Sequence, residues 1–223
     1  MAPPRRVLLQ FAHPVLERSR VNRRLLTVAR QLAGVTINDL YENYPTFSID
    51  VRREQALLDD HDVILFQHPF YWYSTPAILK EWQDLVLEHG WAYGRDGTHL
   101  RGKITCNLVS TGGAAAAYQH EGRNRFTMRE LLSPWDQTAF LCGMRFLAPL
   151  VLHGSFRVGS DEELAPHAQV YRRFLEGLRD DTLDLEALAA APYANDLVTA
   201  TAAGAAAGAT ESSSSSERAE PAS

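Results

Sequence analysis

The sequence predicts an α/β protein in which five parallel strands form a doubly wound sheet with helices on both faces. Short, continuous apolar runs alternate with segments of helical periodicity over residues 1–185, which is the pattern of consecutive strand–helix–strand units. The chain has 223 residues, of which 45% are hydrophobic and 22% charged, and a chain of this length buries enough surface for a full core. Residues 186–223 are rich in Ala, Ser, Thr and Glu, and this composition predicts a disordered tail.

The first half of the chain supplies three of the strands. Residues 7–12 (VLLQFA) form a continuous apolar run, which is typical of a parallel strand covered on both faces. Apolar residues then recur at helical spacing over residues 21–33, and residues 35–40 (VTINDL) predict the second strand. A short helix over residues 51–60 leads to the third strand, over residues 62–67.

The second half of the chain continues the alternation. Pro76 suits the first turn of a helix, where its missing N–H costs nothing, and Gly90 ends that helix. The remaining predicted elements are a strand over 103–110, a helix over 128–143 that includes Pro134, a strand over 146–153 and a closing helix over 161–179. Ligands of doubly wound sheets bind outside the carboxyl ends of the strands, so the segments after strands one, three and four are the informative ones.

Charge and cysteine usage narrow the class of protein. The net charge of −5 gives no general attraction to nucleic acid or anionic lipid, so we expect no nucleic-acid partner. Cys106 and Cys142 lie in apolar surroundings, which favours buried free thiols over a disulfide and fits a cytoplasmic protein. The apolar run before His13 is too short for a signal peptide or a spanning helix, so any membrane contact should be peripheral.

The segment after the first strand has the composition of an anion cradle. Ala12-His13-Pro14 is followed by Ser19-Arg20-Val21-Asn22, which opens the first helix. The unpaired amides and the positive dipole end of a helix both favour phosphate. On this segment alone the ordinary alternative is favoured, in which Ser19 is an N-cap and His13 a polar loop residue.

The segments after strands three and four add an aromatic wall and a glycine pair. Phe70, Tyr71, Trp72 and Tyr73 are consecutive aromatic residues whose alternate side chains need a partner, either a flat aromatic cofactor or a second subunit. Ser110-Thr111-Gly112-Gly113 permits positive φ and a close approach of the backbone to a ligand, or forms a simple tight turn.

Several common catalytic sequences are absent. The sequence contains neither G-x-G-x-x-G nor G-x-x-x-x-G-K-[ST], which disfavours a dinucleotide Rossmann site and a P-loop. It also lacks G-x-S-x-G, H-E-x-x-H and any other metal-spaced cluster, so hydrolase and metalloenzyme interpretations have no supporting residues and no metal is expected.

Longer stretches resemble a known family. AHP with Ser19 and Asn22, FQHPFYWYSTPAILKEWQDLVL, GWAYG and STGG resemble the flavodoxin-like NAD(P)H:quinone oxidoreductases, most closely the bacterial ancillary proteins of the glutathione-regulated potassium-efflux (Kef) antiporters. DLYENYPTFSID and REQALL belong to the same match, which covers residues 6–180. The resemblance implies that residues 1–185 are a flavodoxin-like FMN-binding oxidoreductase domain. It also implies NADPH or NADH as hydride donor, a quinone-type acceptor, and a homodimer with the active site between subunits.

The resemblance also assigns roles to residues. It places His13, Ser19, Arg20, Val21 and Asn22 around the FMN phosphate, Phe70, Tyr71, Trp72 and Tyr73 along the ribityl chain and isoalloxazine, and Ser110, Thr111, Gly112 and Gly113 at the pyrimidine edge. The substrate-facing tyrosine, five residues beyond the second glycine, is Tyr118. The family's histidine, six residues further on, is replaced by Asn124, and His120 is out of register.

Two other functions are compatible with the same residues. As a regulatory module, the protein would bind the cytoplasmic domain of a potassium-efflux antiporter, and its flavin would serve structure more than turnover. That role implies a peripheral position on the cytoplasmic face of the inner membrane. As an azo- or nitro-compound reductase, it would use the same site with a different acceptor.

Overall fold

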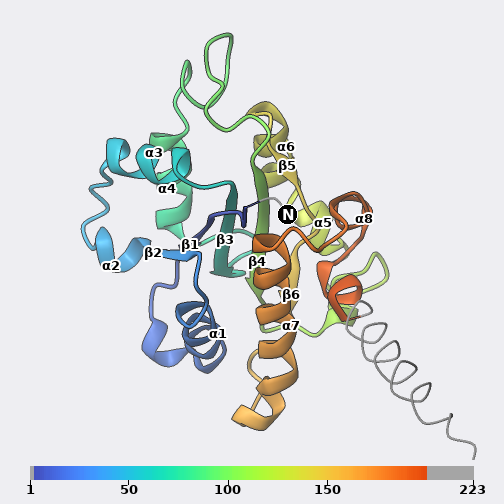
Figure 1. Ribbon diagram of the computed structural model, residues 1–223. Coiled ribbons are helices and arrows are strands. Elements are labelled where there is room, and N and C mark those ends of the chain that lie inside the picture. The colour runs from blue at the N-terminus through green and yellow to red at the C-terminus, as the bar shows by residue number, and fades with distance from the viewer. Residues whose placement is uncertain (1–2, 200–223) are drawn as a thin grey trace, which may run out of the picture.

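The computed structural model describes residues 3–199, and its centre is a parallel sheet (Figure 1). The strands are β1 (Val7–Phe11), β2 (Val35–Asp39), β3 (Val63–Pro69), β4 (Ile104–Ser110), β5 (Arg145–Phe146) and β6 (Leu150–Leu152). Their order is β2-β1-β3-β4-β5, with β6 also paired to β4, and every pairing is parallel. The order reverses between β1 and β3, so the predicted flavodoxin-like, doubly wound sheet is confirmed.

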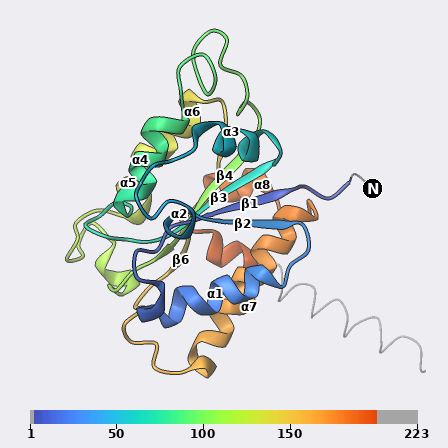
Figure 2. The same cartoon turned by 90° about the vertical axis from the view of Figure 1, so that its left-hand side faces the viewer.

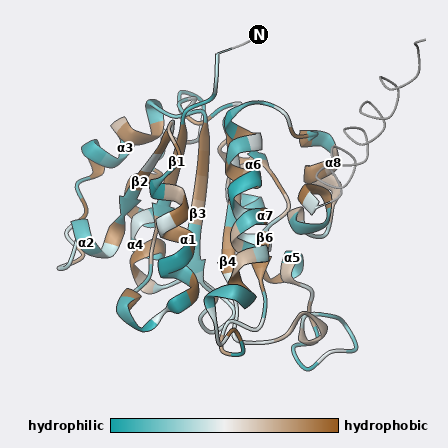
Figure 3. Cartoon of the chain, turned by 60° about the horizontal axis from the view of Figure 1, so that its bottom comes forward, coloured by the Kyte–Doolittle hydropathy of each residue, from teal (hydrophilic) through white to brown (hydrophobic). Residues whose placement is uncertain are grey.

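Two hydrophobic cores lie on opposite faces of this sheet, which confirms the prediction of helices on both faces (Figure 2). Alternate residues of a strand enter different cores: Leu65 packs in one, whereas Ile64 and Phe66 pack in the other. The first core is covered by α1 (Arg20–Arg30) and α7 (Asp161–Arg179). The second is covered by α2 (Leu40–Asn43), α3 (Val51–Asp59), α4 (Ala77–Val86), α5 (Met128–Leu131) and α6 (Ser133–Leu141). β3, hydrophobic for most of its length, lies between these layers (Figure 3).

Two predicted elements are divided. The strand predicted over 146–153 consists of β5 and β6, because Pro149 has no N–H and the N–H of Ala148 donates to the carbonyl of Leu188 instead of to the sheet. The helix predicted over 128–143 consists of α5 and α6, and Pro134 stands in the first turn of α6, where its missing N–H is harmless. The closing helix over 161–179 is confirmed as α7.

The boundary predicted for the C-terminal tail is too early. Residues 186–199 contribute most of α8 (Leu185–Ala190) and a helical segment over 194–199, and Leu188, Ala194 and Val198 are buried in the first core. The side chain of Asn195 donates to the carbonyl of Val151 and accepts from its N–H, which satisfies the free edge of β6. Residues 200–223 of the predicted tail lie outside the described residues.

Two further sequence expectations concern thiols and membrane spans. Cys106 and Cys142 are both free and buried, as predicted, and burial raises the pKa of the Cys106 thiol to about 12. Within residues 3–199, no helix combines the length and the apolar character that a membrane crossing requires.

Candidate active site

Two adjoining cavities lie where β1, β3 and β4 end. The larger has a volume of about 980 Å³. It is lined by His13, Val15, Arg18, Ser19, Arg20, Val21, Asn22, Pro69, Phe70, Tyr71, Trp72, Ser110, Gly112, Ser155 and Phe156. The smaller has a volume of about 580 Å³. It is lined by Phe70, Trp72, Tyr73, Gly112, Gly113, Ala114, Ala117, Tyr118, Arg123, Asn124, Phe156 and Arg157. The two share Phe70, Trp72, Gly112 and Phe156, so they form two parts of one site.

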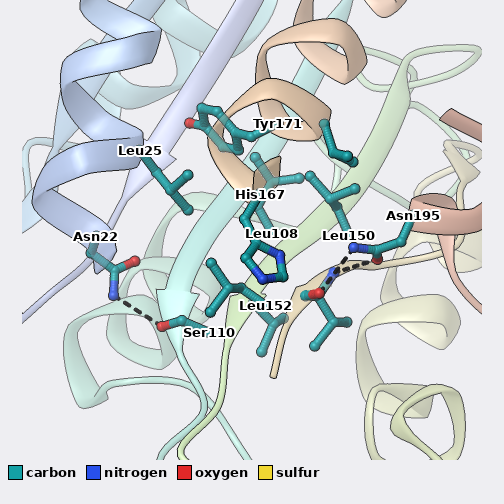
Figure 4. A pocket seen from close by; sticks show the side chains of 12 residues that line it. Asn22, Leu25, Leu108, Ser110, Leu150, Leu152, His167, Tyr171 and Asn195 are labelled. Atoms are coloured by element: carbon teal, nitrogen blue, oxygen red, sulfur yellow. Dashed lines mark hydrogen bonds between the residues drawn. The ribbon is translucent and has the colours of Figure 1, made fainter. Parts of the chain in front are cut away.

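The loop after β1 is fastened to the end of β4 through Asn22. Ser19 caps α1, and its Oγ accepts from the Asn22 backbone N–H (3.2 Å). The Asn22 side chain donates to Ser19 Oγ (3.0 Å) and to Ser110 Oγ (2.9 Å; Figure 4). Its Oδ1 accepts from Gln67 of β3, whose own Oε1 accepts from the hydroxyl of Tyr171. Asn22 is therefore fully bonded within the protein, and its side chain holds the loop in place.

The end of the larger cavity at α1 suits an anion. The first backbone N–H groups of α1, those of Arg20 and Val21, find no acceptor among residues 3–199 and carry the positive end of the helix dipole. The exposed guanidinium groups of Arg18 and Arg20 line the same cavity, and no acidic side chain lines it. The arrangement can hold a phosphate by backbone donors and by charge.

His13 lies at this cavity but brings no charge to it. Its ring is almost fully buried, and its Nδ1 accepts from the N–H of Val15 (3.2 Å). Burial lowers its pKa, and the nearby Glu17 carboxylate opposes that shift only partly. The ring meets Tyr71 edge-on at 6.4 Å between centroids. His13 therefore acts as a neutral, shape-forming residue where the aromatic loop meets the first loop.

The aromatic loop holds two strained residues. Trp72 and Tyr73 have φ values of 50° and 62°, a left-handed conformation that costs an L-residue roughly 1–2 kcal/mol. Two backbone hydrogen bonds between Tyr71 and Ser74 (2.9 and 3.1 Å) keep this turn closed. As a result the Trp72 side chain is 93% exposed at the shared wall of both cavities. Exposed aromatic surface held at such a cost favours a ligand or partner that covers it.

The glycine pair is needed for close approach and not for backbone conformation. Neither Gly112 nor Gly113 has a positive φ, contrary to one of the two reasons that the sequence suggested. A Cβ at Gly112 would overlap the ring of Phe156, which lies against it, and a Cβ at Gly113 would lie 3.3 Å from the Tyr118 ring. A side chain at Gly112 would require the exposed Phe156 ring to move, and one at Gly113 would lie in tight contact with the Tyr118 ring.

The backbone of the glycine loop offers hydrogen-bond donors to the site. The carbonyl of Gly113 accepts from Thr111 Oγ1 (2.8 Å) and from the N–H of Gly154 (2.9 Å). Because the N–H of a trans peptide points opposite to its carbonyl, the Ala114 N–H is directed away from these partners. Within residues 3–199, the N–H groups of Gly112, Gly113 and Ala114 have no acceptor. Consecutive free N–H groups can stabilise a negatively charged ligand edge.

Tyr118 lines the smaller cavity, but no histidine predicted from the sequence lies beside it there. Its ring packs against Phe70 (6.2 Å between centroids) and against His153 (5.3 Å). His120 instead pairs with Glu130 at 3.0 Å and lines neither cavity. Asn124 lines the smaller cavity, and its Oδ1 accepts from the hydroxyl of Tyr73 (3.4 Å).

His153 lines neither cavity, but it packs against Tyr118 and Thr111 behind the site, and the sequence analysis assigned it no role. Its Nδ1 lies 3.3 Å from Thr111 Oγ1, whose hydroxyl hydrogen is already donated to Gly113, so Nδ1 carries the proton. The other nitrogen, Nε2, is buried without a partner among the described residues. Burial lowers the pKa of His153 to about 4, and the ring is therefore neutral at pH 7. The sequence feature that could have identified His153 is its position directly after the last strand, β6.

The structure thus brings nearly all of the predicted residues to one site. His13, Ser19, Arg20, Val21, Asn22, Tyr71 and Ser110 line the larger cavity, Tyr73, Gly113 and Tyr118 line the smaller one, and Phe70, Trp72 and Gly112 line both. Thr111 lines neither cavity, and its hydroxyl donates to the carbonyl of Gly113. Sequence analysis did not find Arg18, Arg123, Ser155, Phe156 or Arg157, which come from loops whose proximity depends on the fold.

Comparison with known proteins agrees with this geometry. The family model described as flavodoxin-like fold matches residues 5–175. The glutathione-regulated potassium-efflux system ancillary protein KefG of Shigella flexneri serotype 5b (strain 8401) is 47% identical over 175 residues, which are 78% of this chain and 95% of KefG.

Three solved structures share the fold. General stress protein 14 from Treponema denticola, in complex with FMN, is 35% identical, with a TM-score of 0.74 over 78% of this chain and 99% of that one. An NADPH-quinone reductase from P. pentosaceus is 31% identical, with a TM-score of 0.69 over 76% and 96%. A chain of the thermophilic tryptophan halogenase from Streptomycin violaceusniger is 43% identical, with a TM-score of 0.73 over 76% and 97%.

Proposed function

We propose, on the premise that this chain belongs to the family with the flavodoxin-like fold, that it is an FMN-dependent oxidoreductase that passes hydride from NADPH or NADH to a quinone-type acceptor. One observation carries the proposal: the loops after β1, β3 and β4 form one site that has anion-binding donors at one end. At its other end are free backbone donors and exposed aromatic rings. The FMN-bound stress protein and the NADPH-quinone reductase support it as relatives.

The residues present fit FMN. Its phosphate matches the first N–H groups of α1 with Arg18 and Arg20, and its flat ring matches the aromatic turn and the bare backbone at Gly112. The larger cavity, at about 980 Å³, is within the range of cofactor sites. Its lining contains no carboxylate that would oppose a phosphate.

FMN, when bound, supplies the two-electron hydride chemistry, and the protein supplies position and electrostatics. The N–H groups of Gly112, Gly113 and Ala114 would stabilise negative charge at the edge of a bound ring. Tyr118, at the smaller cavity, would orient the oxygen of the acceptor by a hydrogen bond. Trp72 and Phe156, at the boundary of both cavities, would limit the access of water.

KefG supports a partner role as well as an activity. By its name KefG is an ancillary protein of a potassium-efflux system, and on that basis we propose that this protein works at the cytoplasmic face of the inner membrane. There it would bind the cytoplasmic domain of the antiporter as a homodimer. A flavin-bound regulator without turnover, and an azo- or nitro-compound reductase, are the alternatives that use the same site. Because one fold hosts several chemistries, the fold does not identify the acceptor. The site and the NADPH-quinone reductase relative support a quinone.

The proposal is tested on purified full-length protein. We expect a flavin absorbance spectrum and oxidation of NADPH with menadione in ping-pong kinetics. Colourless protein that FMN does not reconstitute would overturn the proposal. The regulatory alternative is separated by measuring activation of the antiporter by a variant that binds FMN but does not turn over. Full activation would favour the regulatory role over the catalytic one.

A further inference from the structure

The smaller cavity carries a positive charge that the FMN site does not need. Arg123, from the loop after Tyr118, and Arg157, from the loop after β6, both line it, although 33 positions separate them along the chain. Neither guanidinium forms an ion pair or a side-chain hydrogen bond within residues 3–199, and no acidic side chain lines this cavity. The chain as a whole has a net charge of −5, so this local charge runs against its average.

Some of the other arginines within residues 3–199 are neutralised locally. Arg53, Arg129, Arg145, Arg172 and Arg179 each pair with a carboxylate. Of the other arginines that lack an ion pair within residues 3–199, Arg18 and Arg20 line the larger cavity and the rest line neither. What distinguishes Arg123 and Arg157 is therefore their position, because both line the smaller cavity from separate loops. Guanidinium groups bind phosphate by charge and by paired N–H donors, which makes phosphate the favoured ligand.

The position of this cavity indicates which molecule would carry the phosphate. It meets the larger cavity at Phe70, Trp72, Gly112 and Phe156, while Arg18 and Arg20 lie in the larger cavity only. A flat ring at the shared wall would therefore have one anion site on the α1 side and a second beside Arg123 and Arg157. The first suits the phosphate of the resident cofactor, and the second suits a phosphate on the molecule that exchanges with the acceptor.

We propose that Arg123 and Arg157 form a second anion subsite, which binds the 2′-phosphate of NADPH and makes it the preferred hydride donor over NADH. The inference deepens the proposed function and rests on it for the identity of the donor. The extra phosphate is the one chemical difference between the two nucleotides, so a pair of cationic side chains is the kind of group that separates them.

The test compares Arg123→Gln, Arg157→Gln and the double variant with Arg95→Gln. Arg95 is an exposed arginine that lines neither cavity, which makes it a matched control. Each single change should raise KM for NADPH about tenfold, the loss of roughly one charge-assisted contact, with kcat and FMN content retained. KM for NADH should change less than twofold. Arg157→Lys should restore part of the NADPH preference because it keeps the charge.

A binding measurement separates this inference from the proposed function. Calorimetry with adenosine 2′,5′-bisphosphate and with 5′-AMP reports the subsite without any turnover. Binding of the bisphosphate but not of 5′-AMP, lost in the double variant, supports the subsite. Absence of NADPH oxidation would reject the proposed function but would leave this binding result, and with it the subsite, intact. Equal changes for NADPH and NADH, or unchanged bisphosphate binding in the double variant, would overturn the subsite.

Discussion

The protein contains two polar regions that differ in how completely their hydrogen bonds are satisfied. In the first, Glu54 of α3 is fully buried, and both of its oxygens are used. Its Oε2 accepts from Gln10 (3.0 Å), Asn38 (2.7 Å) and Trp82 (2.8 Å), and its Oε1 accepts from Tyr44 (2.7 Å) and Arg53 (2.6 Å). We call this set the Glu54 network. Its members join β1, β2 and α4 to α3 and to the residue after α2.

The second region is the carboxyl edge of the sheet, where donors are left over. The N–H groups of Gly112, Gly113 and Ala114 lack acceptors within the described residues, and Arg123 and Arg157 lack ion pairs there. A saturated network contributes to stability and excludes ligands, whereas unsatisfied donors beside a cavity have interactions left for a ligand. Residues of the first kind build the fold, and residues of the second kind are available for function, although both kinds lie within residues 6–180, which the family resemblance covers.

The largest expected effect comes from breaking the Glu54 network. Glu54→Ala leaves the donors of Gln10, Tyr44 and Trp82 without an acceptor, whereas Asn38 and Arg53 keep others within the network. The free energy of unfolding should therefore fall by about 3–5 kcal/mol. Urea denaturation measures it. Glu81→Ala, an exposed glutamate on α4, is the control and should change stability by less than about 0.5 kcal/mol. A loss near that of the control would show that the network is not structural.

A smaller effect on the free energy, confined to binding, is expected at the carboxyl edge. Gly113→Val places a branched side chain against the Tyr118 ring and in front of the free N–H groups. FMN affinity should fall about a hundredfold, equivalent to about 3 kcal/mol, while the melting temperature of the protein without ligand changes little. Flavin fluorescence titration measures the affinity. Gly159→Ala, where a Cβ meets only one atom at 3.6 Å, is the control. Undiminished FMN binding by Gly113→Val would contradict the assignment of this edge to the flavin.

Two buried histidines show the same contrast between satisfied and unsatisfied hydrogen-bonding groups. His68 is satisfied at both nitrogens, since Nδ1 bonds the carbonyl of Pro69 (3.1 Å) and Nε2 accepts from Asn107 (3.1 Å). His153 has a free Nε2. His68→Phe should therefore cost about 1–3 kcal/mol at pH 7, because it leaves Asn107 without a partner, whereas His153→Phe should cost less than about 1 kcal/mol. Equal losses would erase the distinction.

The same histidines make stability depend on pH. Burial lowers the pKa of both His68 and His153 from 6.5 to about 4. Between these values the unfolded chain binds protons that the folded protein does not, so stability falls as pH falls from 6.5 toward 4. Each histidine should contribute about 1 kcal/mol per pH unit in that window. Urea denaturation at several pH values should show a smaller slope for either phenylalanine variant, and an unchanged slope would count against the shift.

The last expected effect is on turnover and leaves stability and cofactor content unchanged. Tyr118→Phe removes one hydroxyl from the smaller cavity without changing the packing of its ring on Phe70 and His153. We expect a roughly tenfold lower kcat with a quinone acceptor, about 1.4 kcal/mol, and unchanged FMN content. Stopped-flow kinetics of the reductive and oxidative half-reactions locate the loss. A defect confined to the half-reaction with NADPH would show that Tyr118 acts on the hydride donor and not on the acceptor.

Local patterns were sufficient for the elements and for the edge of the sheet that forms the site. The apolar run of β1 and the periodicity of α7 are properties of consecutive residues, and they appear in the structure nearly where the sequence placed them. The same holds for the three loops, because parallel strands joined by helices bring their carboxyl ends to one edge whatever their order. The sequence by itself therefore determined the fold class and most of the candidate residues.

Tertiary structure alone decided which loops meet and what each glycine or histidine does there. Three features join segments that are distant along the chain: Arg123 and Arg157 line one cavity, His153 lies beside Thr111, and the Phe156 ring lies against Gly112. Residues 186–199 likewise belong to the core because Asn195 bonds the edge of β6 and nearby apolar side chains pack against the first core. Such contacts depend on strand order and packing, and no local pattern of polarity encodes them.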